Sequence, residues 1–194
     1  MKNNKCKYLL LILISFSLLQ SCKKFLAAKP DKSLALPETL NDLQLMLDNY
    51  SLLNGGYPAI GEVSSDNFYL TDASWGSTSQ SDQHYYLWQP YDNNVGDYEN
   101  PNTAITTVNL ILESLKKIND ISQTKTVQAD KIEGSALFFR AFSYWELAQY
   151  FCKGYNKVTA SSDLGLPIRL SSSVIEKYKR SSVEQTYQQI ISDL

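Results

Sequence analysis

The first regular pattern of apolar residues surrounds Pro37. Leu36, Leu40, Leu43 and Leu47 recur mostly at intervals of three and four residues, the spacing of one face of an α-helix. Because proline suits the first turn of a helix, the sequence predicts an amphipathic helix over residues 37–49. The Asn-Gly-Gly run at 54–56 predicts a break after it.

Two stronger helical patterns lie in the middle of the chain. Apolar residues between Ile105 and Ile118 form one stripe and predict a helix over residues 102–118. A second stripe predicts a longer helix over residues 126–152. The short polar segment between them is typical of an αα-hairpin, in which two antiparallel helices pack together.

The longer of these two predicted helices carries small residues between large ones. The small residues are Gly134, Ser135, Ala136, Ala141 and Ala148. Small side chains let neighbouring helices approach closely, while the phenylalanines between them fill the remaining gaps. Arg140 lies in the same stretch, and we expect its guanidinium to pair with an acidic or carbonyl group inside the helix stack.

The last part of the chain combines a polar connector, residues 153–180, with a final helix. Ser181 is followed three residues later by Glu184, a spacing that predicts a capping box at the start of that helix. The apolar stripe of the helix runs to Leu194, where the chain stops within the pattern. This favours either a continuation beyond residue 194 or packing of Leu194 on the preceding hairpin.

The segment from Tyr57 to Gly96 lacks this periodicity. It is rich in aromatic residues set among Ser, Asn, Asp and Gly, and it is longer than an ordinary connection inside a compact domain. The aromatic content argues against simple disorder. We therefore expect a long irregular loop with a function, parts of which could form short helical turns.

The N-terminus has the layout of a lipoprotein signal peptide. Three lysines precede an apolar run, residues 8–19, that is shorter than the roughly 20 residues a membrane-spanning helix needs. The run ends in Leu-Gln-Ser-Cys, which resembles a lipobox with Cys22 as the lipid attachment site. The sequence therefore predicts a signal peptide over residues 1–21 and a lipidated tether over residues 22–35. The alternative is ordinary secretion, with a cysteine at this point by chance.

Composition excludes several classes of function. The 194 residues contain 18 basic and 20 acidic side chains, and no basic cluster follows the leader and the two lysines beside Cys22, which disfavours nucleic-acid binding. Lipidation and leader removal leave Cys152 alone, so no disulfide framework is expected. The single histidine, His84, has no spaced Cys or His partner, and we expect no metal and no cofactor.

Seven strings of residues, in this order, resemble the SusD/RagB family of outer-membrane lipoproteins. They are CKKFL from Cys22, KPDKS from Lys29, LPETLNDLQ from Leu36, TAITTVNLIL from Thr103, EGSALFFRAFSY from Glu133, GLPI from Gly165 and RSSVEQTY from Arg180. Each string alone is an ordinary amphipathic pattern, but their order behind a lipobox is specific.

This resemblance implies a fold, a location and a partner. The fold would be all-α, with tetratricopeptide-like helix pairs and the long aromatic loop. The protein would be lipid-anchored and exposed at the outer membrane, where it would hold glycans or peptides for a SusC-like TonB-dependent transporter. Because family members are commonly more than twice as long, residues 36–194 would form the N-terminal helical domain of a longer protein.

The aromatic loop offers the residues that a sugar site needs. Sugars present apolar C–H faces and hydroxyl groups, so their sites combine flat aromatic rings with amides and carboxylates. The candidates are Trp75, Tyr85, Tyr86 and Trp88 as platforms, and Asp66, Asn67, Asp72, Gln83 and Gln89 as polar partners. The alternative for each ring is that it packs onto the helices as a plug.

The sequence thus favours a surface lipoprotein that binds glycans for uptake and has no catalytic residues. Asp66 and Asp72 could suggest a glycosidase pair, but their spacing within a loop does not define their separation in space. Two other functions remain open: a tetratricopeptide-like scaffold that binds a partner protein, and a SusD homologue that binds peptides.

Overall fold

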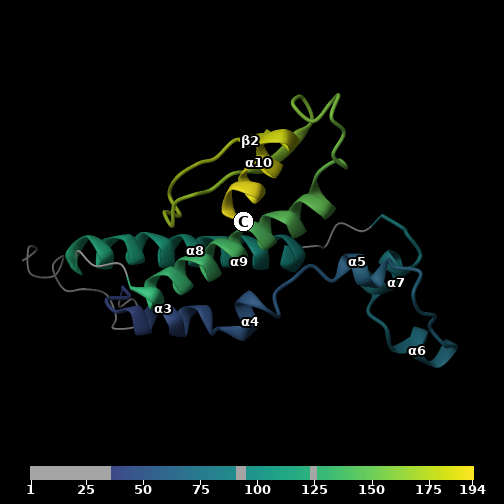
Figure 1. Cartoon of the computed structure of the whole chain (residues 1–194). Helices are drawn as coiled ribbons and strands as arrows, with labels where there is room; N and C mark the ends of the chain where they lie inside the picture. Colours follow the sequence, from purple (N-terminus) through teal and green to yellow (C-terminus); the bar gives the residue numbers. More distant parts are fainter. Residues whose placement is uncertain (1–35, 91–94, 123–125) are drawn as a thin grey trace, which may run out of the picture. The chain divides into compact units, whose positions relative to one another are not determined.

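The computed structural model describes residues 36–90, 95–122 and 126–194, nearly all of which belong to one compact unit, Pro37–Leu194 (Figure 1). The predicted signal peptide, the lipid site at Cys22 and the tether lie outside the described residues. Within the described part, no helix combines the length and apolar character that crossing a membrane requires.

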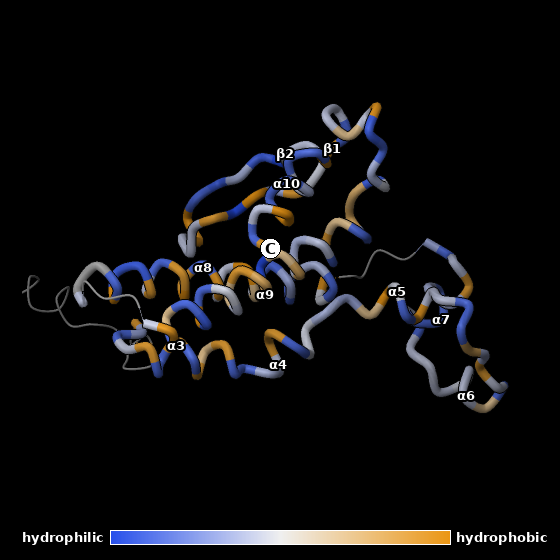
Figure 2. The backbone as a smooth tube through the Cα atoms, viewed as in Figure 1, coloured by the Kyte–Doolittle hydropathy of each residue, from blue (hydrophilic) through white to orange (hydrophobic). Residues whose placement is uncertain are grey.

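Two long helices form the centre of this unit. α8 spans Val95–Ser122 and α9 spans Val127–Phe151, and they pack along each other as the predicted hairpin (Figure 1). Short hydrophobic and hydrophilic stretches follow one another along both helices, as expected for helices with one buried face (Figure 2). The side chain of Thr126 caps α9 by accepting a hydrogen bond from the backbone N–H of Ala129 (3.1 Å). The prediction for α9 is therefore correct to within one residue at each end.

α8 begins seven residues earlier than predicted, and Pro101 lies inside it. Because proline has no backbone N–H, it cannot donate the hydrogen bond to the carbonyl four residues earlier. For this reason the sequence predicts that the helix begins after Pro101. Beside Pro101, Asn102 Nδ2 donates to the carbonyl of Tyr98 (2.7 Å), and Thr103 Oγ1 donates to that of Glu99 (2.9 Å). These side chains add hydrogen bonds to the helical turn around the proline.

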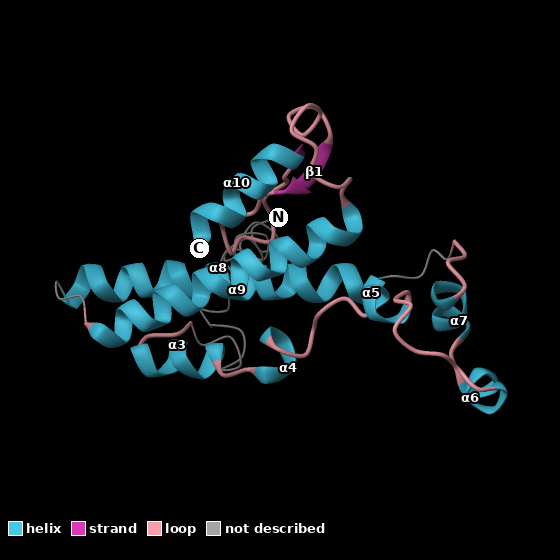
Figure 3. Ribbon diagram, turned by 45° about the vertical axis from the view of Figure 1, so that its right-hand side comes forward, coloured by secondary structure: helices cyan, strands magenta, loops and turns pink. Residues whose placement is uncertain are grey.

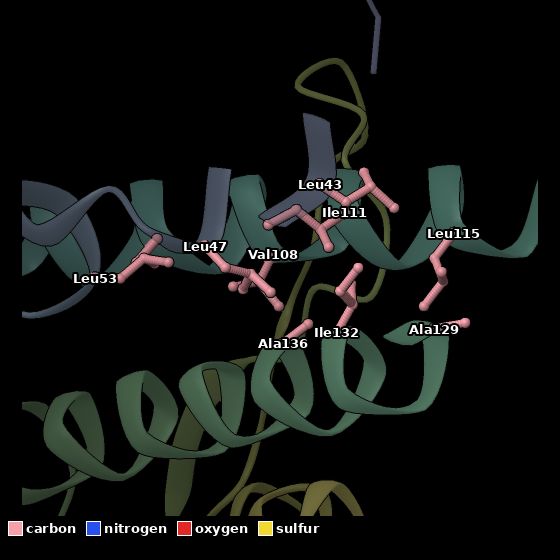
Figure 4. Packing of buried hydrophobic residues seen from close by; sticks show 10 residues of the cluster. Leu43, Leu47, Leu53, Val108, Ile111, Leu115, Ala129, Ile132 and Ala136 are labelled. Atoms are coloured by element: carbon pink, nitrogen blue, oxygen red, sulfur yellow. The ribbon is translucent and has the colours of Figure 1, made fainter. Parts of the chain in front are cut away.

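A shorter helix, α3 (Leu40–Leu47), packs on both long helices. It begins after Thr39, whose side chain forms a capping box with Asp42, and the four-residue helix α4 (Tyr50–Leu53) follows it. The predicted helix over 37–49 is thus shorter than expected. The core that these elements share includes Leu43, Leu47, Leu53, Val108, Ile111, Leu115, Ala129, Ile132 and Ala136 (Figure 4).

The prediction about small residues on α9 is correct for the alanines only. Ala136, Ala141 and Ala148 are buried, and they allow the close helix contacts. Gly134 and Ser135 are exposed, and no atom outside the local helix backbone would lie within 4 Å of a Cβ added at Gly134. The interpretation of these two residues as packing positions is wrong.

The C-terminal part contains a short sheet that the sequence does not predict. β1 (Leu164–Pro167) and β2 (Arg180–Ser182) pair antiparallel beside α10 (Val183–Asp193), although most of the unit is helical (Figure 3). The capping box of α10 uses Ser182 and Gln185, one residue later than predicted. Leu194 is 79% exposed, so most of its side chain is not covered by the hairpin.

The segment expected to be a long irregular loop with some short helical turns contains three short helices, whose positions the sequence does not define. They are α5 (Ile60–Val63), α6 (Asp72–Ser77) and α7 (Gln80–Tyr86). The side chains of Thr71 and Ser79 cap α6 and α7. Helices of four to seven residues are too short to show a periodic apolar stripe, which explains why the sequence pattern misses them.

Candidate functional site

A buried polar network joins α8, α9 and α10. Arg140 on α9 donates to both carboxylate oxygens of Asp193 on α10, from Nε to Oδ2 at 2.8 Å and from Nη2 to Oδ1 at 2.6 Å. Its Nη1 donates to Oδ1 of Asn109 on α8 (2.9 Å). The Arg140 and Asp193 side chains are only 10% and 3% exposed. The expected pairing of Arg140 is confirmed, and its partner is a carboxylate.

The same network holds the backbone that follows β1. Asn109 Nδ2 donates to the carbonyls of Arg169 (3.0 Å) and Ser171 (3.2 Å). The Tyr144 hydroxyl donates to the Arg169 carbonyl (2.8 Å) and accepts from the Arg169 N–H (2.6 Å). Burial raises the pKa of Tyr144 to about 12, so the hydroxyl keeps its proton at neutral pH. Residues 169–171 are therefore fixed against the helix hairpin.

Glu113 on α8 holds the next residue of this segment. Its carboxylate accepts from the N–H of Ser172 (2.8 Å) and from the Ser172 hydroxyl (2.6 Å). Burial raises the pKa of Glu113, but the hydrogen bonds from Ser172 outweigh it and leave the pKa below its usual value. The carboxylate is thus charged and bound at neutral pH.

Three rings in the 57–90 segment form an aromatic cluster, defined as Phe68, Trp75 and Tyr86. The Tyr86 ring centroid lies 5.9 Å from that of Trp75 on α6 and 5.7 Å from that of Phe68. Trp75 and Tyr86 are half-buried and Phe68 is exposed. The rings of the cluster therefore pack against Tyr86 while part of their aromatic surface remains in contact with solvent.

Trp88 follows α7 and is 79% exposed. Its backbone has φ 56°, a left-handed conformation that is unfavourable for a residue with a side chain. The turn is held by hydrogen bonds from the N–H of Trp88 to the Tyr85 carbonyl (3.0 Å) and from the N–H of Gln89 to the His84 carbonyl (2.8 Å). A large ring presented to solvent by a strained turn is a suitable platform for a ligand.

The structure corrects two candidates from the sequence. Tyr85 is only 9% exposed, so it belongs to the packing of α7 and not to a platform. Gln83 Nε2 donates to the carbonyls of Trp75 (2.8 Å) and Thr78 (3.2 Å), so its amide donors tie α6 to α7. The periodicity of a seven-residue helix is too short to reveal which side faces inward.

The polar candidates lie at the solvent-facing side of the segment. Asp66 and Asn67 are exposed in the turn after α5, and Gln89 is exposed after α7. Asp72 is exposed at the first position of α6. These groups are accessible to a ligand, in contrast to Gln83.

Two clefts lie outside the aromatic segment. A polar cleft of about 450 Å³ lies between the first half of α8 and the segment after β1. An apolar cleft of about 310 Å³ is lined by Phe138, Ala141, Phe142, Trp145, Ile190 and Leu194 of α9 and the end of the chain. The sequence analysis identifies neither, because their residues come from segments far apart in the chain.

Groups that could support catalysis are sparse in this part of the molecule. Among the described residues, no three His, Cys, Asp or Glu side chains are grouped to hold a metal ion. Cys152 is half-buried at the end of α9, and burial raises the pKa of its thiol, which makes it a poor nucleophile at neutral pH.

Comparison with known proteins agrees with this description. Residues 24–194 match the SusD-like family described as "Starch-binding associating with outer membrane", which is a binding family and not an enzyme family. Among curated proteins, none matches the chain.

Two solved structures share the fold. A SusD superfamily protein from Bacteroides fragilis is 18% identical with a TM-score of 0.65, and the match covers 81% of this chain and 38% of that one. One from Bacteroides thetaiotaomicron is 24% identical with a TM-score of 0.60, covering 80% of this chain and 36% of that one. The chain therefore spans little more than a third of these structures, and the match over residues 24–194 shows that it belongs to the SusD-like family.

Proposed function

We propose that this chain is the N-terminal part of a lipoprotein that binds glycans at the cell surface and delivers them to a SusC-like TonB-dependent transporter. The observation that carries this proposal is the aromatic cluster together with the exposed Trp88, two residues after Tyr86 in the chain, in a family described as starch-binding. Aromatic faces stack on the C–H faces of sugars, and the exposed Asp66, Asn67 and Asp72 can bond hydroxyl groups.

The proposed anchor is Cys22, which would carry the lipid at the outer membrane. The lipobox pattern and the family's described association with the outer membrane support it. Residues 22–35 would then act as the tether between the bilayer and the helical unit.

Calorimetry with the full lipidated chain in detergent tests glycan binding. Maltoheptaose is the probe, because the family description refers to starch. We expect binding that weakens at least about tenfold when Trp88 becomes Ala, and further when Trp75 also becomes Ala. Trp145→Ala is the matched control, because this tryptophan is also partly exposed, at 42%, but belongs to α9 and not to the aromatic cluster. Equal losses in all three variants would count against the proposed site.

A second candidate is a scaffold that binds a partner protein. The exposed rings of Phe138 and Trp145 beside Phe142 on α9 are the observation that favours it. Affinity purification from the native host, followed by identification of a co-purified transporter, separates the two functions. A transporter complex without any binding to a broad glycan array would favour the scaffold.

A further inference from the structure

We infer that the polar cleft between α8 and the segment after β1 binds the carboxylate of an acidic sugar, such as a uronic acid. This inference rests on the proposed glycan function for the sugar part of the ligand. Recognition of the negative charge rests on the residues of the cleft alone.

The cleft has the size and the chemistry of a small-ligand site. Its volume of about 450 Å³ falls within the roughly 300–1,000 Å³ typical of such sites. Its lining includes Tyr98, Glu99, Asn102, Thr103, Thr106 and Arg169. It therefore combines one aromatic ring, one guanidinium, one carboxylate and several neutral polar groups.

Arg169 is held in place at both its backbone and its side chain. Tyr144 and Asn109 bind its backbone, as described above. Its Nη1 lies 3.4 Å from Thr106 Oγ1, and its Cζ lies 5.2 Å from the ring centroid of Tyr178. A guanidinium that is already oriented loses little entropy when it binds a ligand.

The three arginines of the chain differ in what they bind. Arg140 pairs with Asp193, and Arg180 donates to the carbonyls of Gly165 and two other residues. Within the described ranges, no carboxylate forms an ion pair with Arg169. The planar guanidinium can donate two parallel hydrogen bonds to one carboxylate. The carboxylate of an anionic ligand could therefore pair with Arg169.

The neighbouring groups favour a sugar as the carrier of that carboxylate. Tyr98 is 39% exposed and packs edge-to-face on Phe151 with centroids 5.1 Å apart, which leaves ring surface for a sugar face. The hydroxyls of Thr103 and Thr106 donate to helix carbonyls, so their oxygens can accept from sugar hydroxyls. A uronic acid would place its carboxylate at Arg169 and its ring against Tyr98.

Calorimetry on the full chain with trigalacturonate tests this inference, with maltotriose as the neutral probe and triglutamate as the acidic peptide probe. Arg169→Gln should weaken trigalacturonate binding by about tenfold or more and leave maltotriose binding unchanged. Arg169→Lys keeps the charge but loses the bidentate geometry, and should show an intermediate loss. Lys177→Gln removes one positive charge from an exposed position of the same segment and should have no effect.

The outcomes separate this inference from the proposed function. Binding of maltotriose without binding of trigalacturonate would overturn the acidic-sugar site and leave the glycan function standing, whereas binding of neither would overturn both. Equal losses in Arg169→Gln and Lys177→Gln, or tighter binding of triglutamate than of trigalacturonate, would also overturn the inference. Tyr98→Ala, which leaves the buried network intact, provides a second test if Arg169→Gln fails to fold: unchanged trigalacturonate affinity would contradict the site.

Discussion

Replacing Arg140 with Leu is the strongest test of how much the buried polar network stabilises the packing of α8, α9 and α10. The substitution removes the cation from the Asp193 carboxylate, which is only 3% exposed, and the hydrogen bond to Asn109. Removing one partner of a buried ion pair costs about 3–5 kcal/mol, because the remaining charge stays buried without its counter-ion. The Gln189 amide, which donates to Asp193 Oδ1 (2.9 Å), would be the remaining hydrogen-bond partner on α10. Since a whole domain is stable by only about 5–15 kcal/mol, the variant should lose a large part of its unfolding free energy.

The double variant Arg140→Leu/Asp193→Leu distinguishes the ion pair from simple loss of packing. Replacing both members of a buried pair by apolar residues is often close to neutral, so the double variant should be more stable than Arg140→Leu by about 2 kcal/mol or more. Lys153→Leu is the control, because Lys153 and Asp163 are also 2.6 Å apart but the lysine is 75% exposed. Solvent screens that pair, and its loss should have a much smaller effect.

Urea unfolding followed by far-UV circular dichroism measures these free energies. The reasoning is refuted if Arg140→Leu is no less stable than the Lys153→Leu control. It is also refuted if the double variant is destabilised by the sum of the effects of Arg140→Leu and Asp193→Leu measured separately, because the two residues would then act independently.

Three further predictions follow from local chemistry. Cys22→Ser should abolish metabolic labelling with a fatty-acid analogue, and persistent labelling would exclude lipidation at this residue. Burial, and next a nearby carboxylate on α5, raise the pKa of Glu146 above its usual 4.5. The unfolding free energy should therefore decrease as the pH rises from about 4.5 through the raised pKa. Urea titrations at several pH values should show this decrease become smaller in Glu146→Gln; an unchanged pH profile would contradict it. Gly165→Ala should destabilise the fold by about 1–3 kcal/mol, because the added Cβ would overlap the backbone of Ser182. Gly134→Ala, at an open position of α9, should instead stabilise it by about 0.5–1 kcal/mol, and thermal melting compares the two.

The long helices could be predicted because their apolar stripes extend over many turns. Thr126 marks the start of α9 in the sequence, and the alanines of α9 are buried as expected. The start of α8 could not be predicted, because Pro101 lies inside the helix, although a residue without a backbone N–H usually marks the first turn of a helix. The sheet was missed because β1 and β2 are only four and three residues long.

The candidate site was predicted as a region but not residue by residue. Aromatic enrichment identified the segment that contains Trp75, Tyr86 and Trp88. It could not distinguish the buried Tyr85 from its exposed neighbours, because burial in a short helix depends on contacts distant in sequence. For the same reason, the cleft around Arg169 has no signature in the sequence: its residues lie more than 60 positions apart and meet only through the network around Asn109 and Tyr144.

The three tryptophans of the chain provide the most direct test of glycan binding by the aromatic segment. Each indole N–H gives its own resonance in a nitrogen-15 correlation spectrum, and Trp→Phe variants assign them. The account predicts that maltoheptaose shifts the resonances of Trp75 and Trp88 in a saturable manner and leaves that of Trp145 on α9 unchanged. Saturable shifts confined to Trp145, or no shift at any of the three, would contradict it.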